Sequence, residues 1–396
     1  MPDDLASIDV RGKRVLVRED LNVPLDGGRV TDLTRIEAAV PTLRDLSARG
    51  AKVIVMSHLG RPDGKVVDAL RMAPVAAALA ESLGQPVKTA PDCVGPEAKA
   101  AVDALSDGDV LLLENVRFHK EEEANDDGFA RALASLGDLY VNDAFGTAHR
   151  AHASTCGIAK YLTSYMGPLL ARELEVLDAI LHHPHRPFVA VLGGAKVADK
   201  IAVVDRLMSL CDAIVIGGGM ANTLLAAQGF DVGKSLRDAD LEPAKRIVRE
   251  IEHEATKVDV HLPIDAIVAK QLAPGVETRD VEIDEVLPDD MILDIGAGTA
   301  MDYRGVILDA KTVLWNGPMG VFENDLFAAG TEAVGQAIVD SGAMSVVGGG
   351  DSAAAAHKLG FADKMTHIST GGGATLEYLE GKELPGVAAL RKAANA

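Results

Sequence analysis

Short aliphatic and β-branched runs recur along the chain, and each is followed by a polar or glycine-rich stretch and then by a segment with helical periodicity. Continuous apolar runs of this length are typical of strands buried on both faces. Their alternation with helices predicts parallel sheets that are covered by helices on both sides. The predicted strands are residues 14–18, 52–57, 110–113, 139–142, 188–192, 213–216, 291–295, 312–315 and 345–347.

A longer segment with helical periodicity covers residues 168–182 and ends at a polar patch, residues 182–187 (HHPHRP). The two prolines of the patch would stop a helix, so we predict a boundary between two halves of the chain at this point. The histidines are unevenly spaced across the prolines, which favours an exposed linker over a zinc or nickel site.

These patterns predict an α/β fold with two Rossmann-like domains, whose parallel sheets are flanked by helices, joined by an interdomain helix and hinge. The first domain is expected to cover residues 1–169, the interdomain helix and linker residues 170–186, and the second domain residues 187–379. Composition agrees, because 396 residues with 48% hydrophobic and 25% charged positions suit two or three packed domains.

The chain is acidic, with a formal net charge of −20. This charge argues against general binding to nucleic acid or anionic membranes, because both require attraction to phosphate. The chain has no apolar run of the roughly 20 residues that a membrane helix needs and no signal-like pattern in residues 1–10, so we expect a cytoplasmic protein. Cys93, Cys156 and Cys211 lie far apart without CxxC spacing, which favours reduced packing residues over a disulfide framework or a zinc site.

Cations and polar residues of the first half gather where predicted strands end. Each arginine taken alone is also compatible with an ordinary surface charge. Ligands of open α/β sheets bind at the carboxyl ends of strands, so we expect these residues to converge on one crevice. Arginine forks match carboxylate and phosphate oxygens, which favours a small phosphorylated acid as the ligand. The residues are Arg18, Asp20, Asn22, Arg35, His58, Arg61, Arg117, His149 and Arg150.

The strand ends of the second half are rich in glycine instead. A glycine run between a strand and a helix lets backbone N–H groups reach a phosphate at the positive end of the helix dipole. One such run is equally compatible with a tight turn, whereas five in one half predict a nucleotide-binding domain. The runs are Gly193-Gly194-Ala195-Lys196 with Lys200 beyond it, Gly217-Gly218-Gly219, Asn316-Gly317-Pro318, Gly348-Gly349-Gly350-Asp351 and Gly371-Gly372-Gly373.

Asp351 is the best candidate for a magnesium contact, since Mg²⁺ in nucleotide sites takes one or two carboxylates together with phosphate oxygens. The alternative is that Asp351 caps the helix that follows it. With an acid bound by one half and a nucleotide by the other, the chain is predicted to catalyse phosphoryl transfer across a cleft. The acceptor would be a carboxylate, which is ionised at neutral pH and needs no general base.

At this level of detail the chain resembles the phosphoglycerate kinases over nearly its whole length. The motifs that carry the resemblance appear in that family's order. They are RxDxNVP at 18–24, SHLGRP at 57–62, ENVRFH at 114–119, DAFGTAHRAH at 143–152, GGAKVADK at 193–200, GGGMANT at 217–223, WNGPMGVFE at 315–323, GGGDS at 348–352 and STGGGA at 369–374.

The resemblance implies a phosphotransferase with a carboxyl group as acceptor. Its reaction would be reversible, Mg²⁺-dependent transfer between 1,3-bisphosphoglycerate and ADP, giving 3-phosphoglycerate and ATP in glycolysis and gluconeogenesis. It also implies a monomer whose residues 380–396 return to the first domain. The implied phosphoglycerate contacts are Asp20, Asn22, Arg35, His58, Arg61, Arg117, His149 and Arg150. The implied nucleotide contacts are Lys196, Lys200, Gly217, Gly218, Gly296, Asn316, Glu323, Gly348, Gly349, Gly350, Asp351 and Ser352. Stabilisation of the transferring phosphoryl group would fall to Arg35, Lys196, Gly371, Gly372 and Gly373.

Two positions depart from that family's pattern. Glu19 adds a charge inside the first motif, where a small or aliphatic residue is usual. Ala297-Gly298 replaces a proline and a polar residue, a change that would loosen a base or ribose contact near Gly296.

Two other functions were weighed against this one. A nicotinamide dehydrogenase would need GxGxxG after a strand and an acidic residue about 20 positions later, which this sequence lacks. A catalytically inactive nucleotide-binding scaffold would be expected to have lost Arg35 or Lys196, and both are present.

Overall fold

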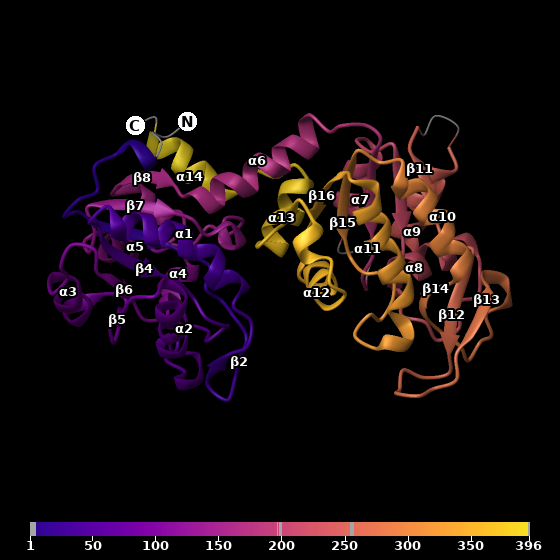
Figure 1. Cartoon of the computed structure of the whole chain (residues 1–396), viewed down its shortest axis with the longest axis horizontal. Coiled ribbons are helices and arrows are strands. Elements are labelled where there is room, and N and C mark those ends of the chain that lie inside the picture. The colour runs from indigo at the N-terminus through magenta and orange to yellow at the C-terminus, as the bar shows by residue number, and fades with distance from the viewer. Residues whose placement is uncertain (1–4, 196, 198–199, 254–256, 395–396) are drawn as a thin grey trace. The chain divides into compact units, whose positions relative to one another are not determined.

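The computed structural model describes residues 5–195, 197, 200–253 and 257–394. The chain divides into two compact units (Figure 1). Unit 1 comprises Met1–Glu175 together with Glu383–Ala396, and unit 2 comprises Val176–Lys382. The helix α6 (Pro168–His182) begins in unit 1 and ends in unit 2, and it stops where the prolines of residues 182–187 begin.

Unit 1 is built on a parallel sheet of six strands in the order β5-β6-β4-β1-β7-β8. A short antiparallel hairpin, β2 (Leu25–Asp26) and β3 (Arg29–Val30), extends from it. The strands of the sheet are β1 (Arg14–Arg18), β4 (Lys52–Met56), β5 (Val87–Thr89), β6 (Val110–Leu112), β7 (Leu139–Asn142) and β8 (Thr163–Met166).

The helices of unit 1 connect these strands. They are α1 (Thr34–Ala48), α2 (Ala73–Leu83), α3 (Gly95–Asp103), α4 (Lys120–Glu123) and α5 (Asp127–Ala134), with α14 (Pro385–Ala394) from the far end of the chain. In Figure 1, α14 lies beside β8, and the Gly386 N–H donates to the Ala148 carbonyl at 2.9 Å. The C-terminal segment is therefore part of the first unit.

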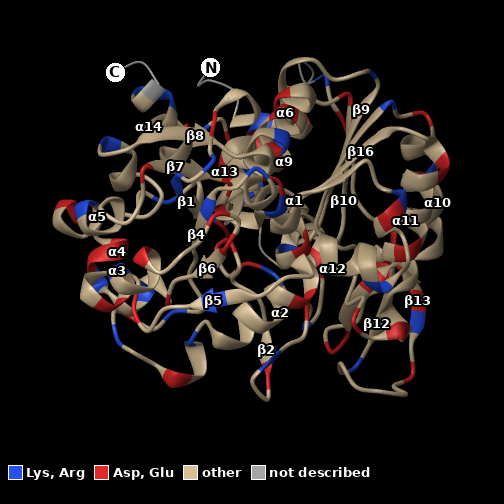
Figure 2. Ribbon diagram, turned by 60° about the vertical axis from the view of Figure 1, so that its left-hand side comes forward, with Lys and Arg blue, Asp and Glu red and all other residues tan. Residues whose placement is uncertain are grey.

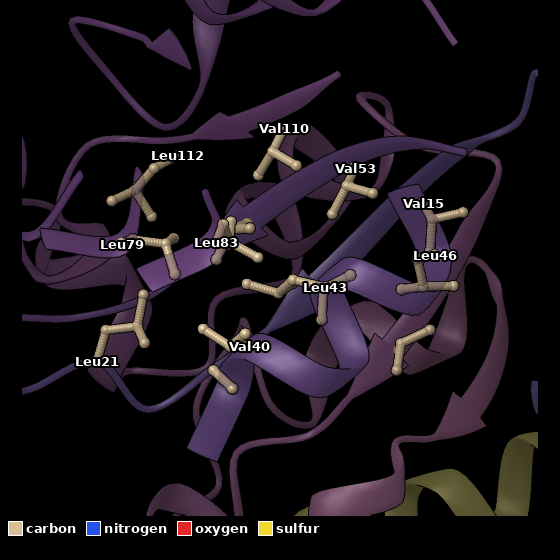
Figure 3. Packing of buried hydrophobic residues seen from close by; sticks show 14 of the residues in the cluster. Val15, Leu21, Val40, Leu43, Leu46, Val53, Leu79, Leu83, Val110 and Leu112 are labelled. Carbon is tan, nitrogen blue, oxygen red and sulfur yellow. The ribbon is translucent and has the colours of Figure 1, made fainter. Parts of the chain in front are cut away.

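The core of unit 1 is aliphatic. Val15, Val53 and Val110 of the sheet face Leu43 and Leu46 of α1 in Figure 3, and all five are buried. Burying a side chain of this size contributes about 1.5–3 kcal/mol. The packing of α1 on the sheet therefore stabilises the strands whose ends carry the candidate site. The low aromatic content of the chain is consistent with such a core.

Unit 2 contains a second parallel sheet of six strands, in the order β11-β10-β9-β15-β16-β17. Its strands are β9 (Phe188–Leu192), β10 (Ala213–Ile216), β11 (Asp259–His261), β15 (Thr312–Asn316), β16 (Met344–Val347) and β17 (His367–Ile368). Its helices are α7 (Ile201–Met208), α8 (Gly218–Gln228), α9 (Glu242–Ile251), α10 (Ala297–Leu308), α11 (Ala329–Ser341), α12 (Gly350–Lys358) and α13 (Gly372–Leu379).

The strand predicted at residues 291–295 forms, but it does not join a parallel sheet. It is β14 (Met291–Ile295) of a separate sheet, β13-β12-β14, in which β12 (Asp265–Ala269) pairs antiparallel with both β14 and β13 (Arg279–Glu282). An apolar run specifies a buried strand without specifying the direction of its neighbours, which is why the sequence pattern placed it wrongly.

The two units thus form two α/β domains with parallel sheets flanked by helices, which confirms the predicted fold class. Among the described residues, none of the helices is both long and apolar enough to cross a membrane. Basic and acidic residues are interspersed along the chain in Figure 2.

Candidate active site

Four neighbouring strands of unit 1, in the order β6-β4-β1-β7, deliver polar residues to the carboxyl edge of the sheet. The sequence predicted this convergence from strand ends alone. The loops that follow these strands carry residues 18–22 after β1, 57–61 after β4, 114–117 after β6 and 143–150 after β7.

A chain of hydrogen bonds joins the first two loops to α1. Arg35 Nη1 lies 3.1 Å from Asp20 Oδ2 and donates to the Asn22 carbonyl at 3.0 Å. The Asn22 Oδ1 accepts from the Gly60 N–H at 2.8 Å. These contacts hold together the side chains of Asp20, Asn22 and Arg35. The side chain of Arg35 is about one-third exposed.

Arg117 extends this network, because its Nη1 donates to the Gly60 carbonyl at 2.8 Å. Its Nη2 is buried and makes no hydrogen bond within the described residues. Burial and the charges of Arg150 and Arg18 together lower the pKa of Arg117 to about 10, while Glu123 acts in the opposite direction. A buried cation with donors to spare is suited to an anionic ligand.

His58 lies within the same cluster of cations. Its Nδ1 is 3.2 Å from Arg18 Nη2 and 3.8 Å from Asp20 Oδ1. Burial lowers the pKa of His58 well below its usual range, and Arg18, Arg117, Arg150 and Arg35 all lower it further. The imidazole is therefore neutral at pH 7. The positive charges of four arginines all disfavour its protonation.

The other predicted residues of this edge are less deeply held. Arg150 Nε donates to His149 Nε2 at 3.1 Å, and both side chains are partly buried. Arg61 follows on the same loop as His58 and is exposed.

The sequence analysis placed Arg18 in this cluster but did not find Ser154 and Glu122, the residues that support it. Arg18 is 1% exposed and donates from Nε to Ser154 Oγ at 2.8 Å. Ser154 in turn donates its hydroxyl to Glu122 Oε1 at 2.6 Å and its N–H to Glu122 Oε2 at 2.9 Å. Glu122 lies in α4, which Figure 2 colours mostly red for its run of glutamates, and such a run usually forms a solvated face. No sequence signal marked Glu122 as buried.

Two further titratable groups lie at this edge. Burial lowers the pKa of His152 to about 4, with help from Arg117, Arg18 and Arg150. Glu19 is fully buried, and neither carboxyl oxygen has a hydrogen-bond partner among the described residues. Burial and the nearby Asp143 raise the pKa of Glu19 well above its usual range. These surroundings disfavour the charge that the sequence adds at this position.

The glycine-rich loops of unit 2 also lie at a carboxyl edge, after the adjacent strands β10, β9, β15, β16 and β17. Several of these glycines are required by close packing of loop against loop. A Cβ on Gly193 would lie 2.0 Å from the Pro318 carbonyl oxygen, and one on Gly217 would lie 2.6 Å from Met319 Sδ. The Gly218 N–H is already bonded to the Met319 carbonyl at 2.9 Å. Close packing of the loops therefore accounts for Gly193 and Gly217.

The runs that open α12 and α13 differ from the tightly packed run that opens α8, because Gly350 and Gly372 border open space. A Cβ on Gly350 would meet nothing within 4 Å, and one on Gly372 would meet only the Gly350 N at 3.5 Å and the Gly349 Cα at 3.6 Å. The positive ends of two helix dipoles therefore lie side by side next to open space. The amides of residues 350–352 have no acceptor among the described residues, so they remain available for an anion.

Lys200 adds a charge to this edge. Its Nζ donates to the Gly193 carbonyl at 2.8 Å and to the Asn316 carbonyl at 3.2 Å. Burial lowers the pKa of Lys200 to about 8, and Asp351 acts in the opposite direction. The ammonium is thus largely charged at pH 7 and close enough to Asp351 to interact with it.

Asn316 and Ser352 tie the loops of this edge together. Asn316 Nδ2 donates to the Gly348 carbonyl at 2.8 Å, and Ser352 Oγ accepts from the Gly317 N–H at 2.6 Å. Asn316 Oδ1 is buried without a partner among the described residues. Asp351 is exposed in the first turn of α12, and its carboxylate makes no hydrogen bond within the part of the chain that is described, so the helix-cap alternative is not supported.

Comparison with known proteins shows the family to which the chain belongs. The family model described as phosphoglycerate kinase matches residues 5–382. The chain belongs to the phosphoglycerate kinase family. The family is one of glycolytic kinases, so the chain is a transferase of that class.

Curated relatives named phosphoglycerate kinase cover almost the whole chain. The protein from Pelotomaculum thermopropionicum is 54% identical over 384 residues, which is 97% of each chain, and that from Moorella thermoacetica is 55% identical over 387 residues, or 98% of each. The solved structure of the phosphoglycerate kinase from Coxiella burnetii covers 99% of both chains at 40% identity with a TM-score of 0.87. The structure from Pyrococcus horikoshii has the same TM-score at 35% identity and covers 98% of both chains.

Two nucleotide positions implied by the family resemblance lie away from the paired helix ends. Gly296 precedes α10, whose first amides are already taken, because Gly298 and Thr299 N–H groups both donate to the Asp265 carboxylate at 2.7 Å. The carbonyl of exposed Glu323 accepts from Lys358 Nζ at 2.9 Å, at the opposite end of α12 from Gly350. That helix is about 13 Å long. Lys196 lies outside the described residues.

Proposed function

We propose that the chain catalyses reversible transfer of the acyl phosphate of 1,3-bisphosphoglycerate to ADP, with Mg²⁺, giving 3-phosphoglycerate and ATP. The observation that carries this proposal is the pair of complementary anion sites: buried arginines at the sheet edge of unit 1, and paired helix N-termini with Lys200 at that of unit 2. Family membership supports the same reaction.

In unit 1 we assign the phosphoglycerate contacts to Asp20, Asn22, Arg35, His58, Arg61, Arg117, His149 and Arg150. The unpartnered Nη2 of Arg117 and the mutual repulsion of the cations both favour a bound anion. A phosphate would replace unfavourable charge contacts with charge-assisted hydrogen bonds. The Arg35 guanidinium is already oriented by Asp20 and Asn22, which lowers the cost of ordering it when ligand binds.

In unit 2 we assign the nucleotide phosphates to the amides at the start of α12, residues 348–352, and to Lys200. Glu323 at the far end of α12 suits a ribose contact, because its loop is anchored by Lys358. The absence of side chains at Gly217 and Gly218 allows the loops of this edge to approach one another closely. Asn316 joins two of these loops through its hydrogen bond to the Gly348 carbonyl. Gly296 fits a nucleotide contact least, because Asp265 fills the start of α10.

The residues at the start of α12 also fit a magnesium ion. Asp351 offers an exposed carboxylate that makes no hydrogen bond to another described residue, and hard oxygen ligands are what Mg²⁺ prefers. Asp351 would hold the ion together with phosphate oxygens of the nucleotide. When bound, Mg²⁺ supplies neutralisation of charge on the phosphates.

The chemistry needs positioning and charge stabilisation rather than a base. The acceptor carboxylate has a reference pKa of about 4 and is ionised already. Arg35, Lys196 and the amides of Gly371, Gly372 and Gly373 would stabilise charge on the equatorial oxygens of the transferring group. Neutral His58 would donate a hydrogen bond to the acid rather than take its proton.

Because the two ligands bind to different units, transfer requires the units to approach and exclude water, so we propose a hinge motion that both ligands favour together. Small-angle scattering should show a smaller radius of gyration with 3-phosphoglycerate and a nonreactive MgATP analogue than with either alone. We further propose a cytoplasmic monomer that binds neither nucleic acid nor membranes, supported by its glycolytic family and its net charge of −20.

The direct test follows ATP-dependent formation of 1,3-bisphosphoglycerate from 3-phosphoglycerate in a coupled assay. Arg150→Ala should raise KM for 3-phosphoglycerate and leave KM for ATP nearly unchanged, because a positioning contact acts on the ground and transition states alike. Arg131→Ala is the matched control, since Arg131 is an exposed arginine of unit 1 on α5. Absence of activity in the wild-type chain would refute the proposed function.

A further inference from the structure

Three potential metal ligands that are not among the proposed phosphoglycerate contacts meet in unit 1. Asp92 and Cys93 lie in the loop between β5 and α3, and His119 precedes α4. One ligand atom of each, a carboxylate oxygen, the Sγ and an imidazole nitrogen, lies within 4.8 Å of the other two. Among the described residues this is the one such group of three.

The group is already oriented. His119 Nε2 lies 2.7 Å from Asp92 Oδ1, and the same oxygen accepts from the Cys93 N–H at 2.6 Å. His119 also packs against the ring of Phe129, with the ring centroids 5.1 Å apart. The imidazole, the carboxylate and the loop that carries the thiol are thus held by the fold before any ligand arrives.

The burial of the three groups differs in a way that suits a bound ion. Cys93 is fully buried, while the side chains of Asp92 and His119 are 41% and 27% exposed. A cation could therefore reach the carboxylate and imidazole from solvent, with the thiol behind them. Burial and the Asp92 charge raise the pKa of the Cys93 thiol well above its usual range, so an alternative role as a free nucleophile is not favoured.

We propose that Asp92, Cys93 and His119 form a binding site for a thiophilic divalent cation, of which Zn²⁺ is the best match. Thiolate, imidazole and carboxylate are the zinc ligands of proteins, with bonds of about 2.0–2.3 Å. Tetrahedral coordination at those bond lengths puts ligand atoms about 3.3–3.8 Å apart, so sub-ångström to ångström shifts close the site. Water would complete the fourth position.

Binding is balanced by release of a proton. The Cys93 thiol gives up its proton to solvent as the metal–sulfur bond forms. Because Asp92 Oδ1 can only accept, His119 Nε2 carries the proton of the hydrogen bond between them, and this proton passes to Nδ1 by exchange with solvent so that Nε2 and the carboxylate can each bond the ion. The site differs in chemistry from the proposed magnesium contact at Asp351, because Mg²⁺ prefers oxygen ligands and does not select for sulfur. The two ions are therefore distinguishable by experiment.

Cobalt(II) is the probe for the test, because its spectrum reports on sulfur ligation and geometry. The full chain, stripped of metal and kept reduced, should bind one Co²⁺ with a thiolate-to-cobalt charge-transfer band and intense tetrahedral d–d bands. One equivalent of Zn²⁺ should displace the cobalt and abolish these bands, while a large excess of Mg²⁺ should not.

Single substitutions identify the ligands. Cys93→Ser should abolish the charge-transfer band. His119→Gln should weaken Co²⁺ binding by about 100-fold or more, and Asp92→Asn by about 10-fold or more. These magnitudes follow because even the outer partners of metal ligands change metal affinity by about 10–100-fold. Cys211→Ser is the matched control, because Cys211 is another buried thiol, in unit 2. It should retain the wild-type spectrum. Thermal unfolding of each variant shows whether it is folded, and Asp92→Asn remains informative if the buried Cys93 does not tolerate serine.

The exposed histidines His182, His183 and His185 are the competing metal site. A variant with all three changed to glutamine should keep the one-equivalent titration and its charge-transfer band. Cobalt that binds without that band, or a band that persists in Cys93→Ser, would overturn the proposal. Binding that disappears in the triple-histidine variant would overturn it as well.

Discussion

Both units place potential anion-binding groups at the carboxyl edge of a parallel sheet, but the groups are of different kinds. At the edge of unit 1 the donors are side chains, and the cations Arg18, Arg117 and Arg150 repel one another and shift the pKa of His58 and His152. At the edge of unit 2 the donors are mostly backbone amides at the ends of α12 and α13, with Lys200 as the charged addition. The donors available to an anion at the first edge therefore depend on which side chains are present. At the second edge they depend on glycines, whose lack of a side chain leaves backbone amides accessible.

The largest effect is expected from removing an oriented cation of unit 1. Arg35→Ala should lower kcat by about 10²- to 10³-fold, the range for loss of one preorganised charge-stabilising donor. Steady-state kinetics of ATP-dependent 1,3-bisphosphoglycerate formation measure it. Arg35→Lys, which keeps the charge but not the fork, should recover only part of the loss. A kcat near that of wild type would remove Arg35 from the chemistry.

A pair of glycine substitutions breaks the comparison within unit 2. Gly193→Ala should lower the free energy of unfolding by about 1–3 kcal/mol, because the new Cβ would lie 2.0 Å from the Pro318 carbonyl oxygen. Gly350→Ala should leave stability within about 0.5 kcal/mol and instead weaken ATP binding, since its Cβ enters open space at the start of α12. Chemical denaturation and calorimetric titration separate the two. Equal stability losses would show that the start of α12 is packed rather than open.

The charge at the unit 2 edge should make nucleotide affinity depend on pH. Because the folded Lys200 has a pKa of about 8, its charge is lost as pH rises through 8, well below its ordinary value of 10.5. Affinity for ADP should therefore fall by up to about tenfold per pH unit above 8. Lys200→Arg keeps the charge and should flatten this profile. An unchanged slope in that variant would assign the pH dependence to another group.

The smallest effect concerns stability at the edge of unit 1. His152 has a folded pKa of about 4 against an ordinary value of 6.5, so the unfolded chain binds more protons between these values. Stability contributed by neutral His152 is full above pH 6.5 and is lost as pH falls toward 4, with a slope of at most about 1.4 kcal/mol per pH unit. His152→Asn should reduce this slope in urea unfolding curves.

Much of the framework could be predicted from the chain alone. The strands β1, β7, β9, β10 and β14 have the predicted bounds, because each is built around a short apolar run. Short strands with polar residues were missed, such as β5 (VKT), β8 (TSYM) and β17 (HI), since they form only because a neighbouring strand provides partners.

The site was predictable where it depends on strand ends and not where it depends on burial. The positions of Asp20, Asn22 and Arg117 at one edge follow from the parallel sheet. The burial of Glu122 under Arg18 depends on how α4 packs, which a run of glutamates does not indicate. Likewise, the 25 residues between Cys93 and His119 hide their proximity in the sequence.

The packing of α14 on β8 has a consequence for the order in which the protein can be completed during translation. β8 is the edge strand of the first sheet, and its neighbouring helix is synthesised after all of residues 176–382. At about 5–20 residues per second, the ribosome needs roughly 10–40 s to make that stretch. For that time β8 is left without α14 on the nascent chain, exposed to other polypeptides and to chaperones, while the second domain has time to fold first.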